Sequence, residues 1–539
     1  PAMKKTFFLI CLFASLFAQA QQIHVSGFVS DAHDGEHIIG ANVFLQDRSR
    51  GVATDQKGYF NLAIELPATL CISCIGYEEK CIKVNHTDEP LQIRLQPLTE
   101  ILQSVEVSAT RIEQRTNFNT LTLNAKNIDQ LPTIGSRPDI IKAAQQLPGI
   151  EAATEASSLM IVRGGNPGEN LYLLDNVPLI YVNHLGGFMS VFNSEMINTM
   201  DIYKGGFPAR YGGKLSSIVD LTSKKGDPTK LKGSLSAGLT DLAFAVEGPG
   251  GLKNSSFIVT GRKTLTEALL FTASQISKGS GAQDYNIIYG FHDINAKYTW
   301  APDAKNSFAF NIYEGDDYMR IWKNKNKNGD IERNSISNIW GNLLVSGQWN
   351  SAVSSRLFMA NTLSFTQYRL KNNMKAYLKN AVDTTDFFVK TSSRVSDVSL
   401  RSDWKLFIAN AWTLEYGLQS SYLNYRPNHF ISSFSEVNLP DISSVFDNSL
   451  YLDNKLKFGT WFNGSIGLRA NSFLNKGYHH IALEPRLNLS FNIGQSTVNL
   501  TAMRVTQNAH LMMTPGSIMN NEVWIPADAR IKQIGRAHV

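Results

Sequence analysis

The chain has 539 residues, of which 43% are hydrophobic and 18% are charged, and its formal net charge is +5. This length exceeds that of one ordinary domain, so several domains are expected. The weak net charge, in a sequence without a basic run that carries interleaved aromatic residues, excludes a typical nucleic-acid-binding protein.

The N-terminus has the three parts of a secretory signal peptide. Met3 to Lys5 is positively charged, Thr6 to Ala18 is apolar but too short to span a bilayer as a helix, and Ala18 to Ala20 fits the small-x-small cleavage rule. We therefore expect residues 1–20 to be removed on export. No later apolar stretch reaches the ~18 residues of a membrane helix. A soluble exported protein and a membrane β-barrel both remain open.

Residues 21–98 consist of short β-rich segments separated by turns, which predicts a small all-β sandwich. These segments are 23–31, 40–47, 51–64, 68–77 and 80–84. Between the first two lies His33-Asp-Gly-Glu-His37, which matches the zinc-binding pattern H-x-x-E-H. That pattern needs a helix, so that both histidines share one face. Asp34-Gly35 is instead a turn dipeptide, so we predict solvated turn histidines and no metal.

Residues 21–98 resemble the carboxypeptidase regulatory-like domain. The matching motifs are Gly27-x-Val29-x-Asp31, Gly35-Glu36, Gly40-Ala41-Asn42-Val43, Thr54-Asp55-x-x-Gly58-Tyr59-Phe60 and Ile75-Gly76-Tyr77. The resemblance implies a β-sandwich without peptidase activity.

Three cysteines, Cys71, Cys74 and Cys81, lie near the end of this module. Residues three apart on a strand point to opposite faces, so Cys71 and Cys74 are not expected to share a metal. A hairpin that turns at residues 76–79 would place Cys74 opposite Cys81. An oxidising compartment would allow these two to form a disulfide, and buried free thiols are the alternative.

Residues 116–226 resemble the plug domain of TonB-dependent outer-membrane receptors. The motifs that carry the resemblance, in order, are Ile161-x-Arg163-Gly164, Leu174-Asp175-x-Val177-Pro178, Phe192-Asn193, Tyr203-Lys204-Gly205-Gly206 and Tyr211-Gly212-Gly213. The glycine-rich stretch 163–170 leads into a strand, so we do not interpret it as a phosphate-binding loop.

The segment before the plug, residues 99–115, reads as a linker with a short extended stretch. In front of a plug it resembles a TonB box, through which a periplasmic TonB-type energy-coupling protein would pull by strand addition. The candidate residues are Val105, Glu106, Val107, Ser108 and Ala109.

The resemblance also implies charged contacts between plug and barrel. The candidates are Arg163, Lys204 and the barrel residue Glu484, with ordinary surface contacts as the alternative. Lys204 stands where many relatives have arginine, and lysine acts as a point charge rather than a bidentate donor. Tyr181, Asn183 and His184 lie between plug strands and are candidate ligand contacts, with loop packing as the alternative.

From residue 227 to residue 533 polar and apolar residues alternate. Short connections near 301–305, 350–353 and 408–410 alternate with longer predicted loops, such as 315–336 and 372–390. This pattern is typical of outer-membrane barrels and gives about thirteen strands, although a soluble sandwich shares the period with its faces reversed. Plugged transporters of the family have ~22 strands, so we expect only the N-terminal part of the barrel here. We expect residues 534–539 to be a non-native tail, unlike a strand.

The predicted fold is therefore all-β dominated: a β-sandwich, an α+β plug and part of a transmembrane antiparallel barrel. The resemblance implies a TonB-dependent receptor in the outer membrane of a Gram-negative bacterium, with the N-terminal module in the periplasm. It would import a scarce ligand, such as a siderophore, vitamin, oligosaccharide or peptide. Its partners would be TonB, outer-membrane lipid, the small ligand and a candidate surface lipoprotein. A receptor that signals or binds without transport is the alternative. We expect no cofactor, and no catalytic constellation favours an enzyme.

Overall fold

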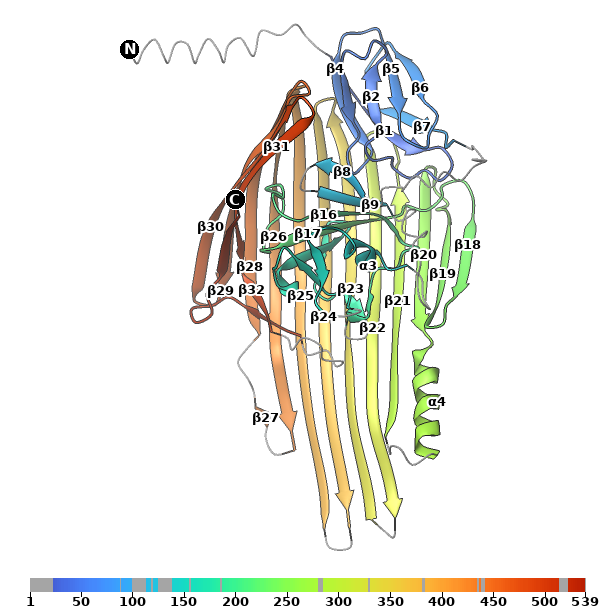
Figure 1. Ribbon diagram of the computed structural model, residues 1–539, viewed down its shortest axis with the longest axis vertical. Coiled ribbons are helices and arrows are strands. Elements are labelled where there is room, and N and C mark those ends of the chain that lie inside the picture. Colours follow the sequence, from blue (N-terminus) through green and yellow to red (C-terminus); the bar gives the residue numbers. More distant parts are fainter. Residues whose placement is uncertain are drawn as a thin grey trace.

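The computed structural model describes residues 23–87, 89–98, 113–117, 120–124, 138–154, 157–184, 187–279, 285–327, 330–380, 383–433, 436–437, 442–512 and 522–538. Figure 1 shows three parts: a small β-rich module at one end, a mixed α/β part in the middle, and a tall curved sheet that runs along both.

The N-terminal module is the predicted β-sandwich. One sheet has the order β4-β1-β7, and the other has the order β3-β2-β5-β6. The strands are β1 (Ile23–Asp31), β2 (Asn42–Leu45), β3 (Gly51–Ala53), β4 (Tyr59–Ile64), β5 (Ala68–Ser73), β6 (Lys80–Val84) and β7 (Leu91–Leu95). Alternate residues such as Val25, Val29, Val43 and Leu62 face each other between the sheets and form a core of their own.

The middle part is the predicted plug. Its six-stranded sheet has the order β13-β12-β17-β16-β9-β8. The strands are β8 (Glu113–Asn117), β9 (Thr120–Asn124), β12 (Asn170–Leu174), β13 (Val177–Leu179), β16 (Ile197–Tyr203) and β17 (Ser217–Ser223). Smaller elements are α3 (Ile140–Ala144), β10 (Ile150–Ala152), β11 (Met160–Val162), η1 (Pro167–Glu169), β14 (Asn183–His184) and β15 (Met189–Ser190). Helix α3 begins at Asp139, whose carboxylate accepts hydrogen bonds from the backbone N–H groups of Ile141 and Lys142.

The tall sheet has 15 strands, which pair with their neighbours in antiparallel order. They are β18 (Lys232–Ala237), β19 (Asp241–Pro249), β20 (Ser255–Thr264), β21 (Asn286–Trp300), β22 (Asn306–Lys327), β23 (Asp330–Ser354), β24 (Leu357–Lys379), β25 (Thr384–Ala409), β26 (Trp412–Ser432), β27 (Glu436–Val437), β28 (Ser443–Phe458), β29 (Phe462–Asn475), β30 (Tyr478–Ile493), β31 (Ser496–Gln507) and β34 (Ile534–His538). Among the described residues, β18 and β34 stand at the two ends of this sheet and are not paired with each other.

Two expectations about the sheet were wrong. Residues 534–538 form strand β34, which pairs with β31, because their backbone continues the hydrogen-bond ladder whatever their side chains. Most described residues of the segments 315–336 and 372–390 lie in strands rather than loops: 315–327 in β22, 330–336 in β23, 372–379 in β24 and 384–390 in β25. Strands β22 and β23 have 22 and 25 residues, more than the ~9–11 that cross a bilayer, so they extend well beyond its apolar band.

Side-chain exposure distinguishes a membrane barrel from a soluble sandwich. On β29, Ile466 and Leu468 are 54% and 47% exposed on the outer face, while Arg469 and Asn471 are buried on the inner face. A soluble sandwich would bury the apolar face and expose the polar one. The outward apolar face therefore supports the barrel prediction.

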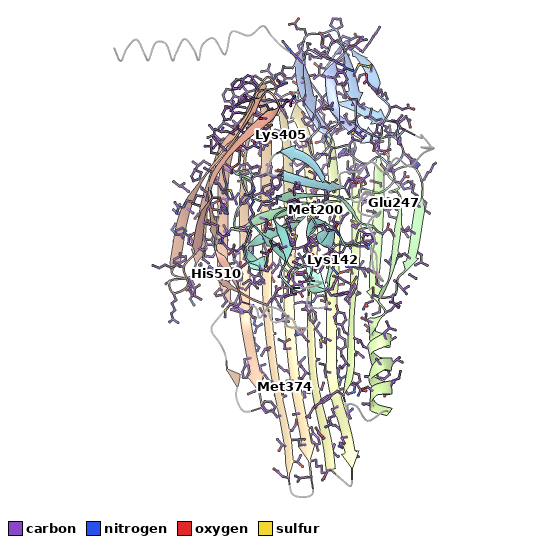
Figure 2. The ribbon with its side chains drawn as sticks, viewed as in Figure 1. Lys142, Met200, Glu247, Met374, Lys405 and His510 are labelled. Carbon is purple, nitrogen blue, oxygen red and sulfur yellow. A yellow bond between two sulfur atoms is a disulfide. The ribbon has the colours of Figure 1, made fainter. Side chains whose placement is uncertain are left out.

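The plug lies against the concave side of this wall, and side chains from both fill the space between them (Figure 2). The module lies at the end where β21 turns into β22, β23 into β24 and β25 into β26. Helix α4 (Thr266–Gly279) lies toward the opposite end (Figure 1). The helices within the described ranges include none that is long and apolar enough to cross a membrane.

The remaining hairpin, β32 (Ala509–Met512) with β33 (Val523–Pro526), connects β31 to β34 and packs on the plug side of the wall. The backbone carbonyl of Glu522 accepts a hydrogen bond from the Tyr368 hydroxyl on β24 at 3.2 Å. Trp524 lies over the plug residue Lys214, whose Nζ is 4.0 Å from the indole centroid.

Candidate functional site

The hairpin between β12 and β13 sets up the first contact of plug and barrel. Asp175 and Asn176 both have positive φ, 50° and 67°, the backbone of a type I′ turn that aspartate and asparagine tolerate. This conformation directs the Asp175 carboxylate to the Ser223 backbone N–H at 3.0 Å. On β21, Lys297 reaches the same carboxylate at 3.2 Å, and both side chains are 6% exposed.

A second contact is centred on His184 of β14. Its Nδ1 lies 2.7 Å from Asp317 Oδ2 and its Nε2 lies 3.0 Å from Asp293 Oδ2, both on the barrel wall. The ring stacks on Phe291 at 4.1 Å, and Arg262 bonds to Asp293 at 2.6 Å. Burial alone would lower the pKa of His184, but the two carboxylates outweigh it and raise the pKa to about 9. The imidazole is therefore a buried cation held between two anions.

A third contact is made by the plug loop 207–212. Its backbone docks on the barrel: the Ala209 N–H donates to Asp453 at 3.1 Å, and the Arg210 carbonyl accepts from Arg401 at 2.5 Å and from Arg469 at 3.1 Å. The Arg210 side chain lies 3.3 Å from Asp403. A Cβ at Gly212 would lie 2.5 Å from Arg469 Nε, so this glycine permits the close approach.

The contacts of the three predicted residues, Glu484, Lys204 and Arg163, lie within the barrel or within the plug. Glu484 is buried near the plug, but it accepts hydrogen bonds from Arg486 at 2.8 Å and from the Thr506 backbone N–H at 2.9 Å. Arg486 lies two residues along the same strand and therefore on the same face, so it meets the carboxylate before any plug residue does. Lys204 instead donates to the Pro148 carbonyl at 2.8 Å. The Arg163 guanidinium lies against Gly205, where an added Cβ would be 2.8 Å from Nη1.

The candidate ligand contacts are buried rather than open to a ligand. Tyr181 is 4% exposed and stacks on Tyr368 at 5.9 Å. Asn183 is 2% exposed and accepts from the Ser158 hydroxyl at 2.7 Å. Tyr181 and His184 pack the plug against the wall and Asn183 packs within the plug, which fits the loop-packing alternative. The TonB-box candidates, residues 105–109, lie outside the described residues.

The predicted disulfide joins the wrong pair. The bridge is Cys71–Cys81, and Cys74 is a free, half-buried thiol. Strands β5 and β6 pair Cys71 with Cys81 and Ile72 with Lys80, so Cys74 falls in the turn rather than on the strand. The turn is longer than residues 76–79, which moves the register by three residues.

The module contacts the barrel at its short turns. Tyr59 packs its ring on Phe358 at 4.7 Å, and Asp55 pairs with Lys405 at 2.9 Å. Asn410 exchanges two hydrogen bonds with the Ala63 backbone, at 2.8 and 2.9 Å. Figure 2 shows Lys405 near this end of the wall.

The module also contacts the plug, through two loops. Gln56 donates to Asp201 at 2.5 Å, and burial raises the pKa of Asp201 to about 6. In the 33–37 loop, Glu36 accepts from the Lys225 backbone N–H and from Asn198 at 3.3 Å. This loop is a turn followed by a bridge, not a helix, so the zinc interpretation fails. His33 is exposed as predicted, whereas His37 is half-buried.

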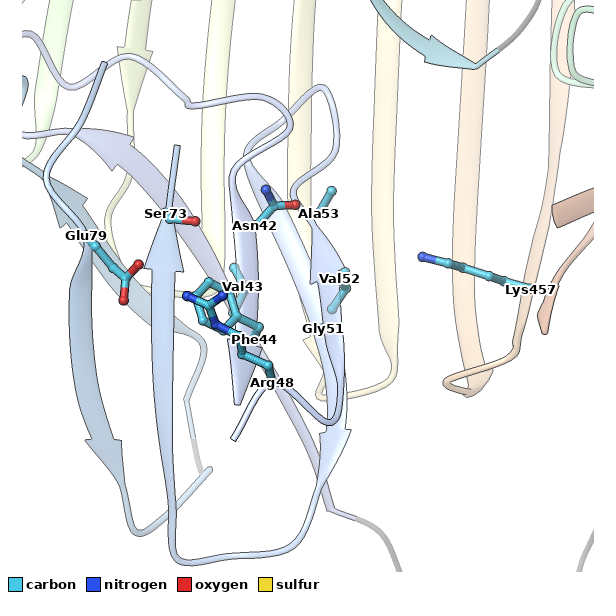
Figure 3. Close-up of a pocket in the computed structure, with 10 residues that line it drawn as sticks. All are labelled: Asn42, Val43, Phe44, Arg48, Gly51, Val52, Ala53, Ser73, Glu79 and Lys457. Atoms are coloured by element: carbon cyan, nitrogen blue, oxygen red, sulfur yellow. The ribbon is translucent and has the colours of Figure 1, made fainter. Parts of the chain in front are cut away.

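Two hollows lie around the module. One, of about 330 Å³, is lined by module, plug and barrel together. The other, of about 410 Å³, lies on the module beside Phe44, with Lys457 of the barrel wall across the gap (Figure 3). The module therefore does not pack tightly against the end of β28.

The architecture is that of a plugged outer-membrane barrel. Residues 25–108 match the CarboxypepD_reg-like domain and residues 113–217 match the TonB-dependent Receptor Plug Domain. The chain is 29% identical to the TonB-dependent receptor SusC of Bacteroides thetaiotaomicron over 236 residues, 40% of this chain and 22% of that protein. It thus spans about a fifth of the length of the curated relatives it matches.

Solved structures agree on the fold. The ferric enterobactin receptor PfeA of Pseudomonas aeruginosa superposes with a TM-score of 0.51 at 15% identity, covering 73% of this chain and 62% of that one. The copper transporter OprC superposes with a TM-score of 0.52 at 11% identity, covering 73% and 64%. The chain therefore carries a carboxypeptidase regulatory-like domain followed by the plug domain of TonB-dependent receptors, and its tall sheet shares the fold of the barrels of such receptors. The curated relatives that it matches are TonB-dependent receptors.

Proposed function

We propose that the protein imports a scarce small ligand across the outer membrane, with energy supplied through a TonB-type periplasmic protein. The observation that carries this proposal is a plug tied to the inner face of the wall by buried ion pairs, such as His184 with Asp293 and Lys297 with Asp175. A lumen occupied in this way is closed to free diffusion. Transport therefore requires that the plug rearrange, and energy must be supplied to break these contacts.

We infer the orientation from the end of the wall opposite the module, where the long strands β22 to β25 extend farthest (Figure 1). In outer-membrane barrels short turns face the periplasm. The module contacts the barrel at the turns near residues 304, 355 and 410, which supports a periplasmic position for it. We propose that TonB engages the candidate residues 105–109 of the predicted linker 99–115 on that side of the membrane.

The ligand class stays broad. The relatives' names include a ferric enterobactin receptor and a copper transporter, and siderophores, vitamins, oligosaccharides and peptides are all candidate ligands. A surface lipoprotein and outer-membrane lipid are further proposed partners.

The test separates import from binding without transport. Val105→Pro and Val107→Pro in the full-length receptor remove backbone donors that strand addition needs. We expect cells with either variant to bind radiolabelled ligand at wild-type levels but not to accumulate it. A Val105→Ile variant keeps the strand and serves as the control. Accumulation that persists in both proline variants, or that persists in a strain without TonB, would contradict TonB-driven import and leave a surface-binding or signalling receptor.

A further inference from the structure

The carboxypeptidase regulatory-like module lies across the short-turn end of the barrel (Figure 1). Its strands β7 and β4 contact three consecutive turns of the wall. Gln92 donates to the Ala304 carbonyl at 3.2 Å, Asn61 donates to the Ser355 carbonyl, and Asn410 bonds to Ala63. The module thus covers the mouth through which an imported ligand would leave.

One aromatic residue on the module is built for this contact. Tyr59 is 1% exposed, yet it belongs to a cluster with Phe358 and Phe407 of the barrel rather than to the module's own core. On an undocked module this ring would face water. Beside it, Lys57 donates to Asn350 and lies 5.6 Å from the centroid of Phe358.

The module also contacts the plug, which is the part that must move. Gln56 bonds to Asp201 on β16, and Glu36 accepts from the Lys225 backbone N–H just after β17. Both strands belong to the central plug sheet. A shift of that sheet therefore acts directly on the module's contacts.

Behind the module lies the cavity of about 330 Å³. Its walls come from the module (Asp55, Lys57), the plug (Tyr203, Arg210) and the barrel (Asp403, Lys455). With the module in place, the module forms one wall of the cavity. With the module displaced it would open toward the short-turn end.

The module's ion pair is the weaker kind of contact. Lys405 and Asp55 are 24% and 27% exposed, whereas His184 and Asp293 at the plug boundary are 1% and 0% exposed. Water and salt screen the former pair far more than the latter. A force that acts on both boundaries should therefore break the contact between module and barrel before the contact between plug and barrel.

We propose that the module is a detachable stopper, an autoinhibitory contact that closes the periplasmic mouth and must leave before a ligand can exit. This inference rests on the proposed import function. It adds that the module gates exit, so that a receptor with its module fixed would still bind ligand outside but would not release it inside.

The test fixes the module to the wall in the full-length receptor. Asp55→Cys with Lys405→Cys, in a Cys74→Ser background, is joined by a short thiol-specific crosslinker that a reductant cleaves. The matched control is Lys457→Cys with Asn463→Cys, which joins the facing strands β28 and β29 at the same mouth and leaves the module free. The probes are radiolabelled ferric enterobactin, cyanocobalamin and maltoheptaose.

We expect the crosslinked receptor to bind the probe that the free receptor imports as well as the free receptor does. Accumulation of that probe should fall at least about 10-fold and recover after the crosslink is cleaved. The control pair should show no loss of accumulation. Equal accumulation with and without the crosslink overturns the stopper while import stands. If no probe accumulates even in the uncrosslinked receptor, the yield of the crosslink between module and wall tests detachment instead. A lower yield in energised cells than in cells treated with a protonophore supports detachment, and equal yields overturn it. A crosslink that never forms overturns the docking itself.

Discussion

The protein has two internal boundaries that differ in chemistry. At the boundary between plug and barrel, charged groups are almost fully buried and paired, as with His184 between Asp293 and Asp317. At the boundary between module and barrel, the ion pair is about a quarter exposed and is accompanied by one aromatic cluster. Breaking a buried pair by removing one partner destabilises by ~3–5 kcal/mol, whereas exposed pairs contribute ~0–1 kcal/mol. The first boundary is built to hold its geometry, and the second is built to separate.

The largest expected effect is at the plug boundary. His184→Ala leaves the buried carboxylates of Asp293 and Asp317 without their shared cation, and we expect the plug to be destabilised by ~3–5 kcal/mol. The measurement is guanidinium-induced release of the plug in detergent micelles. His292→Ala is the matched control. His292 directly precedes Asp293 on the same strand, and its ion pair is with Glu314, in which the two side chains are 43% and 30% exposed. Equal destabilisation of the plug by the two variants would mean that the buried ion pair contributes no more to plug stability than the exposed one.

The disulfide gives the next largest effect, and it is confined to the module. The bridge closes a loop with a sequence separation of 10. Loop-closure entropy for ~10 residues corresponds to about 2–3 kcal/mol, so Cys71→Ser with Cys81→Ser should lower the module's thermal stability by that amount. The plug transition should not move. Cys74→Ser, which breaks no bridge, is the control. A shift of the plug transition of equal size would mean that module and plug unfold as one unit.

Much of the fold, but little of the boundary chemistry, could be predicted from the sequence. Alternation on β29 and β30 is a local pattern, so the strands and their outward apolar face follow from period-two spacing. Cys71 was not identified as the partner of Cys81 because the register of β5 against β6 depends on the length of the turn between them. That length is set by where both strands end and not by the turn sequence alone. The barrel partners of Arg210 include residues 193 and 259 positions away along the chain, a distance over which spacing carries no information. The only local signal was Gly212, whose missing side chain leaves room for Arg469.

The two boundaries should respond to pH in opposite directions. The pKa of His184 is raised from 6.5 to about 9, so its stabilisation of the plug is complete below about pH 6.5 and is lost as pH rises through about 9. Burial, followed by the nearby charges of Lys225, Lys57 and Lys297, lowers the pKa of His37 well below 6.5. Its neutral form is the docked one, so module docking should weaken as pH falls below about 6.5.

The test is to measure plug release and module detachment separately between pH 5 and 10 and to compare how each varies with pH. His184→Ala should flatten the alkaline slope of plug release, and His37→Gln should flatten the acid slope of module detachment. Two slopes of the same sign would show that other groups control both boundaries.

The smallest effect should come from the module's ion pair. Lys405→Met keeps most of the side-chain volume but removes the charge that pairs with Asp55, and exposed pairs of this kind contribute ~0–1 kcal/mol. A cysteine introduced by Ala360→Cys, on the wall of the cavity behind the module, reports detachment through its rate of maleimide labelling. One kcal/mol corresponds to a ratio of about 5, so labelling should accelerate by at most about fivefold. Lys263→Met, whose pair with Glu267 lies at the opposite end of the wall, should leave the rate unchanged. An acceleration of a hundredfold or more would mean that this single contact holds the module as firmly as the buried pairs hold the plug, and a stopper held that firmly would not be the first part to yield.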